Sequence, residues 1–111
     1  KHTEADERKG IIEEYLNRLL PKDWYKKDLQ DRRRHLDDPL SIKGTIERQY
    51  VCVAEVWCEC LGKDKNEMSR YNTRELNEIM KSLSDWESVT STKNFTIYGK
   101  QKYYQRKDSL M

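Results

Sequence analysis

The chain has 111 residues, which is enough for one domain with a modest hydrophobic core. Charged residues make up 38% of it and hydrophobic residues 35%, so we expect a small core under helices with large solvated faces. The net charge of +2 does not by itself indicate a nucleic-acid partner. Without an apolar run of about 18 residues, no membrane-spanning segment is expected.

Residues 4–20 are predicted to form the first helix, which Pro21 ends. Its apolar side chains recur at the spacing of one helical face. They are Ile11, Ile12, Tyr15, Leu16, Leu19 and Leu20.

A second helix is predicted to begin after Asp23, a suitable N-cap, and to run to residue 36. Its apolar face is thin and comprises Trp24, Tyr25, Leu29 and Leu36. Residues 1–38 are therefore expected to be a helical extension, and the composition of residues 37–44 indicates a loop.

Residues 45–51 are predicted to be a short strand that leads into a helix of about three turns. Cys52 occupies the N-cap position of this helix, and Glu55 follows it three residues later, as in a capping box. Gly62 suits the position just after the helix end. Glu55 and Glu59 lie one turn apart, and we expect Glu59 to be solvated.

The cysteines Cys52, Cys58 and Cys60 are odd in number and cluster on this one helix, which does not suit a disulfide framework. Their spacing also lacks the second pair of ligands that a zinc site needs. We therefore expect reduced thiols and a cytoplasmic location.

Residues 72–83 are predicted to form the next helix, with Asn72 as N-cap and Glu75 completing a capping box. Tyr71 and Leu76 are placed to form a hydrophobic staple. The helical spacing assigns one face to the core, formed by Leu76, Ile79, Met80 and Leu83. The opposite face carries Arg74, Asn77 and Lys81, with Glu78 beside them.

The C-terminal part is predicted to be a β-hairpin. Residues 86–91 form one strand, residues 100–106 form the return strand, and residues 92–99 form the loop between them. Residues 89–111 are the most basic part of the chain, with five basic residues and one acidic residue. We expect Trp57 and Trp86 to be core residues, together with one of the adjacent tyrosines Tyr103 and Tyr104.

The predicted order from residue 45 is strand, helix, helix, strand, strand. This order predicts an α+β, mostly helical fold: a winged helix-turn-helix over residues 45–107 with the helical extension before it. In such a fold the second helix of the pair enters the major groove of DNA and the hairpin contacts the adjacent backbone. The candidate DNA-binding residues are Arg70, Arg74, Asn77, Lys81, Lys93, Asn94, Tyr98, Lys100 and Lys102.

Other interpretations remain open. A charged helix face is often only solvated surface, and Glu78 would repel phosphate. The same fold also docks proteins, and the stripe of residues 4–20 favours docking or a homo-oligomer through residues 4–36. An independent enzyme is not expected, because the chain has no phosphate-binding glycine loop, no catalytic triad pattern and no motif that indicates a cofactor.

Three stretches resemble the C-terminal region of the virulence-associated protein E family: "DWYKKDLQDRRRHL", "GTIERQYVCVAEVWCECLG" and "STKNFTIYGKQKYYQRK". This family of phage- and genomic-island-encoded proteins has a central P-loop ATPase domain related to primase-helicases and takes part in replication of mobile elements. The resemblance implies that the present chain follows such an ATPase domain in a longer protein. It implies no ATPase activity for these residues, because they contain no Walker motif.

Overall fold

The computed structural model describes residues 4–107. Its helices are α1 (Glu4–Asn17), α2 (Leu29–Asp37), α3 (Val53–Glu55) and α4 (Arg70–Ser82), and its strands are β1 (Tyr50–Val51), β2 (Trp86–Phe95) and β3 (Gly99–Arg106). One π-helical turn (Val56–Cys60) continues α3, and short 3-10 turns occur at Trp24–Lys26 and Lys65–Glu67. The strands form one antiparallel sheet in the order β1-β3-β2, so the fold is α+β, as expected.

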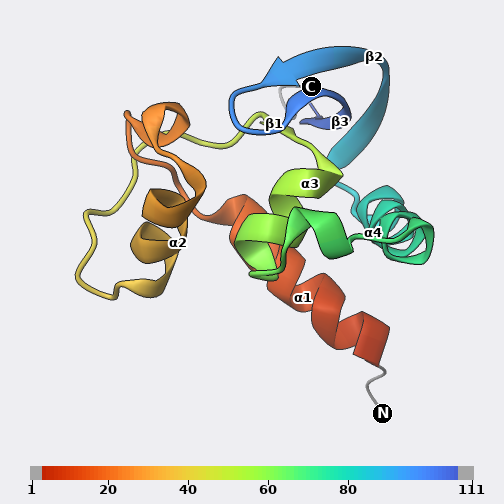
Figure 1. The fold of residues 1–111 in the computed structure, drawn as a ribbon, viewed down its shortest axis with the longest axis horizontal. Helices are drawn as coiled ribbons and strands as arrows, with labels where there is room; N and C mark the ends of the chain where they lie inside the picture. The colour runs from red at the N-terminus through yellow and green to blue at the C-terminus, as the bar shows by residue number, and fades with distance from the viewer. Residues whose placement is uncertain (1–3, 108–111) are drawn as a thin grey trace.

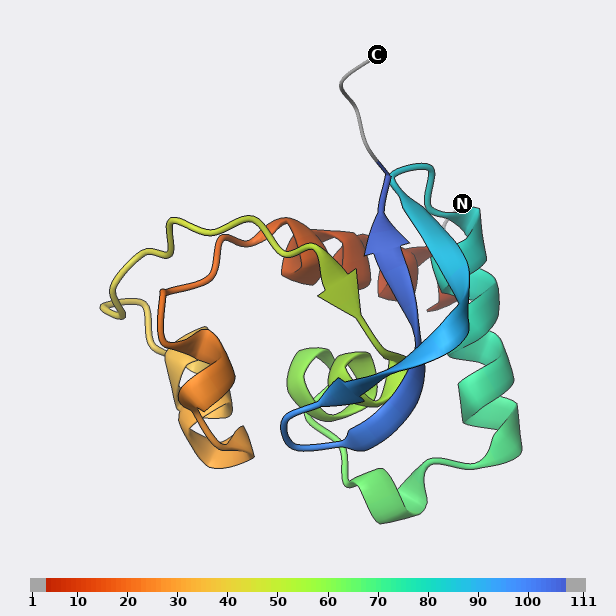
Figure 2. The same cartoon turned by 90° about the horizontal axis from the view of Figure 1, so that it is seen from above.

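The sheet lies on one side of the molecule, with the α3 segment (residues 53–60) beneath it (Figure 1). Helix α4 flanks this segment on one side, and α2 lies on the opposite side of the molecule (Figures 1 and 2). The α3 segment lies at the centre of the core, with Val56, Trp57 and Cys58 all buried. Helix α1 shares this core through Ile12 and Leu16.

The predicted core face of α4 is confirmed, since Leu76, Ile79, Met80 and Leu83 are all buried. Trp57, Trp86 and Tyr104 are buried as well, as expected. The helix itself begins earlier than predicted, because Ser69 is the N-cap and accepts the backbone N–H of Asn72 at 3.1 Å. Asn72 is therefore the capping partner rather than the cap. Tyr71 stays 70% exposed, so it does not form the expected staple.

The N-terminal part differs more from the sequence prediction. Helix α1 ends at Asn17 because Leu20 forms a β-bridge with Ile46, in which the Leu20 N–H donates to the Ile46 carbonyl at 2.7 Å. The predicted second helix is divided into a 3-10 turn and α2. Asp28, not Asp23, caps α2 by accepting the Asp31 N–H at 2.8 Å. The strand expected over residues 45–51 is reduced to Tyr50–Val51.

The predicted capping box of the central helix is confirmed. The side chain of Glu55 accepts the backbone N–H of Cys52 at 3.1 Å. Gly62 follows the helix end with φ of +66°, a conformation that favours glycine.

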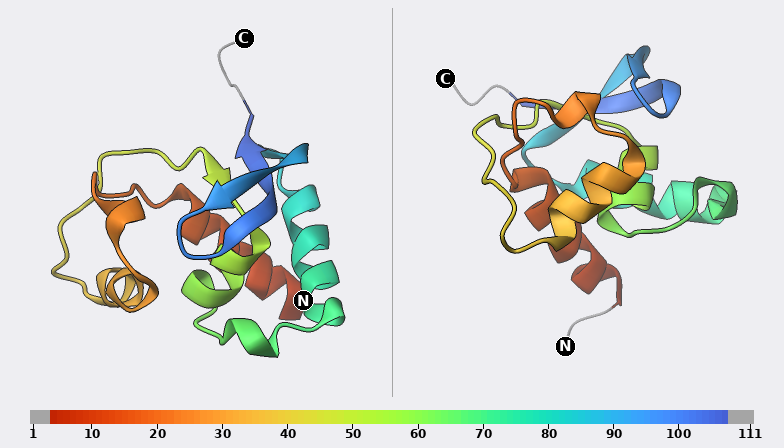
Figure 3. Two further views of the ribbon diagram at one scale, coloured as in Figure 1. Left: turned by 45° about the horizontal axis from the view of Figure 1, so that its top comes forward. Right: turned by 60° about the vertical axis from the view of Figure 1, so that its left-hand side comes forward.

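The hairpin loop is much shorter than predicted, because the two strands pair as far as Phe95 and Gly99. Lys93 and Asn94 therefore lie on β2 and not in the loop. A β-bulge between Val89 and Thr92 interrupts the register, and such bulges bend the strand that carries them. The hairpin tip accordingly turns away from α4 and lies over the α3 segment (Figures 2 and 3).

Candidate nucleic-acid interface

One face of α4 presents basic side chains to solvent. Arg70, Arg74 and Lys81 are all exposed and border a shallow depression of about 520 Å³, as does Glu78. Helix α1 contacts a neighbouring face of α4, where Arg8 forms an ion pair with Glu75. This contact leaves the three basic side chains uncovered.

Asn77 lies on the same side of α4, but its carboxamide is already engaged. Its Nδ2 donates to the Thr73 carbonyl at 3.0 Å, and its Oδ1 accepts the Tyr104 hydroxyl at 2.7 Å. Asn77 therefore ties α4 to β3, and its place among the DNA contacts stays a prediction.

Two lysines of β3 add to the exposed basic side chains. Lys100 and Lys102 are exposed, and they lie on the face of β3 that carries Tyr104, because alternate residues of a strand share a face. Tyr104 contacts α4 through Asn77, so the face of β3 that carries the two lysines is the one turned toward α4 at Tyr104. We call this set the α4–β3 surface: Arg70, Arg74, Lys81, Lys100 and Lys102.

The remaining predicted hairpin contacts lie elsewhere. Lys93 lies on the other face of the hairpin, where its Nζ sits 4.6 Å from the centre of the Tyr50 ring. Asn94 pairs with Lys100 in the strand register but also lines a pocket on the Lys93 side. Tyr98 is buried and donates its hydroxyl to Glu59 Oε2 at 2.7 Å, so its prediction as an outward contact is wrong.

A buried charge cluster lies under the hairpin tip. It consists of Arg32, Arg48, Glu55 and Glu59, each at most 5% exposed. Arg32 Nη1 donates to Glu59 Oε2 at 2.7 Å, and one nitrogen of each arginine lies 3.7 Å from Glu55 Oε2. Burying four charges is tolerable here because each lies against an opposite charge.

Tyr15 and Trp24 join Tyr98 in contact with the cluster. The Tyr15 hydroxyl donates to Glu59 Oε1 at 2.8 Å, and the Arg48 guanidinium lies 4.4 Å from the centre of the Tyr15 ring. Trp24 packs against both arginines. The centre of its ring lies 5.4 Å from the Arg32 Cζ and 5.8 Å from the Arg48 Cζ. Burial raises the pKa of Glu55 to about 7, the Glu59 carboxylate adds to this shift, and Arg48 opposes it.

The expectation that Glu59 is solvated is wrong, and no sequence argument singled out Arg32 or Arg48. The sequence does contain a partial indication that Glu59 and Arg32 are buried. The i, i+4 pair of Glu55 and Glu59 lies on the most apolar helix of the chain, and Arg32 stands between Leu29 and Leu36 on the thin apolar face of α2. No comparable pattern marks Arg48, which lies in an irregular segment.

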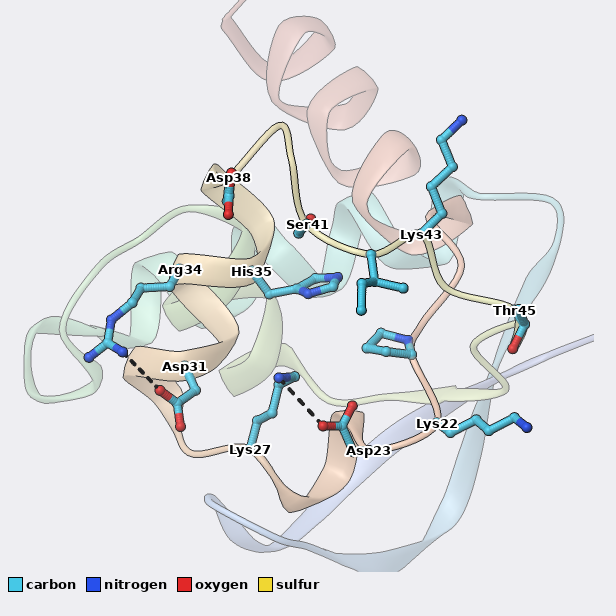
Figure 4. A pocket seen from close by; sticks show the side chains of 12 residues that line it. Lys22, Asp23, Lys27, Asp31, Arg34, His35, Asp38, Ser41, Lys43 and Thr45 are labelled. Atoms are coloured by element: carbon cyan, nitrogen blue, oxygen red, sulfur yellow. Dashed lines mark hydrogen bonds and ion pairs between the residues drawn. The ribbon is translucent and has the colours of Figure 1, made fainter.

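A second cleft, of about 590 Å³, lies between α2 and residues 41–45 (Figure 4). Four charged side chains that line this cleft form two ion pairs. Lys27 pairs with Asp23 at 3.6 Å, and Arg34 pairs with Asp31 at 3.2 Å. His35 points into it, and burial together with nearby Arg18 lowers the pKa of its imidazole.

The surroundings of the three cysteines disfavour their thiolate form. Burial raises the pKa of Cys60 to about 12 and also raises that of Cys52 and Cys58, which opposes the thiolate form needed for nucleophilic or metal chemistry. Among residues 4–107 no group of three His, Cys, Asp or Glu side chains could hold a metal ion.

Comparison of the chain with models of protein families gives no match, and comparison with curated proteins gives none either. The resemblance to the virulence-associated protein E family therefore stays a prediction. Within the described part of the chain, no helix has both the length and the apolar character to span a membrane.

Proposed function

We propose that this chain is a non-catalytic winged-helix module that binds duplex DNA through the α4–β3 surface, mainly at the phosphate backbone. The order of elements supports the winged-helix assignment. Strand β1 is followed by two successive helices and then by the hairpin, and β3 lies between β1 and β2 in the sheet. In folds of this kind the second helix, here α4, is the one that approaches DNA.

The observation that carries the proposal is the exposure of five cations on α4 and on the face of β3 that contacts α4 at Tyr104. Arg and Lys side chains on one face neutralise phosphates, which supplies most of the affinity in sequence-independent binding. Contacts to bases are less favoured here, because Asn77 is engaged with Tyr104 and its carboxamide is not free to read a base edge. The resemblance to the virulence-associated protein E family adds the proposal that the module serves an ATPase of mobile-element replication.

The test is fluorescence anisotropy of the 111-residue chain with a labelled duplex over a series of salt concentrations. Arg74→Ala and Lys102→Ala should each weaken binding, and each should reduce the slope of log K against log salt by about 1. Glu78→Gln should strengthen binding, because it removes a carboxylate beside the phosphates. The matched control is Arg34→Ala on α2, which removes an exposed cation on the opposite side of the molecule (Figure 1).

Binding that depends neither on salt nor on Arg74 and Lys102 would refute the proposal. A role in protein docking would then be favoured. Its specific support is the exposure of Ile11 and Leu19, which leaves part of the apolar stripe of residues 4–20 uncovered. Sedimentation of the chain as a dimer, lost on Ile11→Ser, would support that alternative.

A further inference from the structure

The face of the hairpin that carries Lys93 and Tyr103 borders a pocket that the proposed duplex-binding surface does not use. It has a volume of about 380 Å³ and lies between β2 near the hairpin tip and the segment that leads into β1. Lys93, Asn94 and Phe95 line one side, and Tyr25 and Tyr50 contribute aromatic rings to the other. We call it the hairpin pocket.

The hairpin pocket and the β3 lysines lie on opposite faces of the hairpin. Tyr50 packs edge-on against Tyr103 with 5.8 Å between ring centres. Tyr103 and Tyr104 are adjacent in β3 and therefore point to opposite faces. Because Lys100 and Lys102 share the face of Tyr104, the hairpin separates them from the pocket.

Both pocket tyrosines are held in place yet remain accessible. Tyr25 is 42% exposed, and the buried guanidinium of Arg32 lies 5.7 Å from the centre of its ring. Tyr50 is 39% exposed and is held by Tyr103 on one side and by the Lys93 ammonium on another. Rings fixed in this way lose little conformational entropy when a planar ligand stacks on them.

The polar groups of the pocket suit a base and its phosphate. The Glu47 carboxylate lies 3.8 Å from Arg106 and accepts the Gln49 amide N–H at 3.2 Å, so its charge is partly compensated. Gln49 brings a carboxamide group, which can hydrogen-bond the edge of a base, and Lys93 brings an ammonium group for a phosphate. The volume lies at the low end of the range for small-ligand sites, about 300–1,000 Å³, which suits a single nucleotide.

We propose that the hairpin pocket receives one unpaired base of a single-stranded DNA extension, stacked on Tyr25 or Tyr50, while the α4–β3 surface holds the adjoining duplex. This proposal rests on the proposed DNA-binding function and names the substrate as a junction of duplex and single strand. Bases inside a duplex do not reach such a pocket because they are stacked and paired. An extension leaving the duplex passes around the hairpin tip to reach it.

The experiment compares three labelled DNAs by fluorescence anisotropy with the 111-residue chain: a blunt duplex, the same duplex with a single-stranded extension, and the same extension built from abasic sites. The base-bearing extension should tighten binding about 5-fold or more, since stacking one base contributes about 1–3 kcal/mol. The abasic extension keeps the phosphates but should not give this gain.

Tyr25→Ala and Tyr50→Ala should each reduce the gain without changing the affinity for the blunt duplex. Tyr25→Phe should retain it, because the ring that stacks is still present. Leu40→Ala, at an exposed apolar residue outside the pocket, is the control and should behave like the wild type. Thermal unfolding of each variant checks that it is folded.

The possible failures are distinguishable. No binding of the wild-type chain to any of the three DNAs would refute both the proposed function and this inference. Normal duplex binding with no gain from the extension, or with an equal gain from the abasic extension, would refute the inference alone. Loss of the gain in Leu40→Ala as well would also refute it, because the effect would then not be specific to the pocket.

Discussion

Replacing Arg32 with methionine should test the buried charge cluster most directly. Met fills much of the same volume but leaves Glu59 without its cation. The Glu59 carboxylate would keep only the hydroxyls of Tyr15 and Tyr98, at 2.8 and 2.7 Å. Arg48 would then be the one cation left beside two buried carboxylates within the cluster.

Removing one partner of a buried ion pair costs about 3–5 kcal/mol, because the remaining charge is buried without compensation. A domain of this size has a free energy of unfolding of about 5–15 kcal/mol, so Arg32→Met should remove a large fraction of it. The matched control is Arg34→Met on the same helix. Arg34 pairs with Asp31 in an exposed ion pair whose side chains are 75% and 47% exposed, and its loss should change stability by no more than about 0.5 kcal/mol.

Urea unfolding followed by tryptophan fluorescence measures both variants, with the slope against urea checked for constancy. Arg32→Met should also lower the free energy of unfolding by less in a Glu59→Gln background than in the wild type. In that background no uncompensated carboxylate remains at position 59. An Arg32→Met variant that is no less stable than Arg34→Met would refute the reasoning. So would an unchanged cost in the Glu59→Gln background.

Two further predictions concern stability. The pKa of Glu55 is raised in the folded chain, so the folded state holds a proton that the unfolded state has released between about pH 4.5 and pH 7. The free energy of unfolding that this group contributes is therefore present at low pH and is lost as pH rises through about 7. The loss amounts to up to about 3 kcal/mol. Glu55→Gln should remove this pH dependence. Gly44→Ala should destabilise the chain by about 1–3 kcal/mol or more, since its Cβ would lie 2.3 Å from the backbone oxygen of Leu19. Gly10→Ala should instead stabilise it by about 0.5–1 kcal/mol, because nothing lies within 4 Å of the added Cβ in the helix.

The pH prediction is checked by chemical unfolding at several pH values between 4.5 and 8, and equal pH dependence in the wild type and Glu55→Gln would contradict it. Thermal unfolding compares the two glycine variants. A Gly44→Ala variant as stable as Gly10→Ala would show that the close approach of Gly44 to residues 19 and 20 does not matter for stability.

Local patterns in the sequence were sufficient for much of the secondary structure. The capping box of Cys52 and Glu55 and the core face of α4 depend on residues within one or two helical turns of each other, so spacing alone identifies them. The start of α4 was placed wrongly because both Ser69 and Asn72 are good caps. Local chemistry does not decide between them.

The α+β class, the order of the elements and the basic character of the last segment follow from local patterns in the sequence. The positions of the Tyr98, Glu59 and Arg48 side chains depend on the folded arrangement. Their contacts join residues far apart in the chain, such as Tyr98 and Glu59, and a charged residue is buried only where its partner arrives from another element. The pairing of β2 with β3 likewise divides the predicted DNA contacts between two faces, with Lys93 on one and Lys100 and Lys102 on the other. That division follows from the register between the strands, and the bulge bends the tip over the α3 segment; the residue types along one strand specify neither.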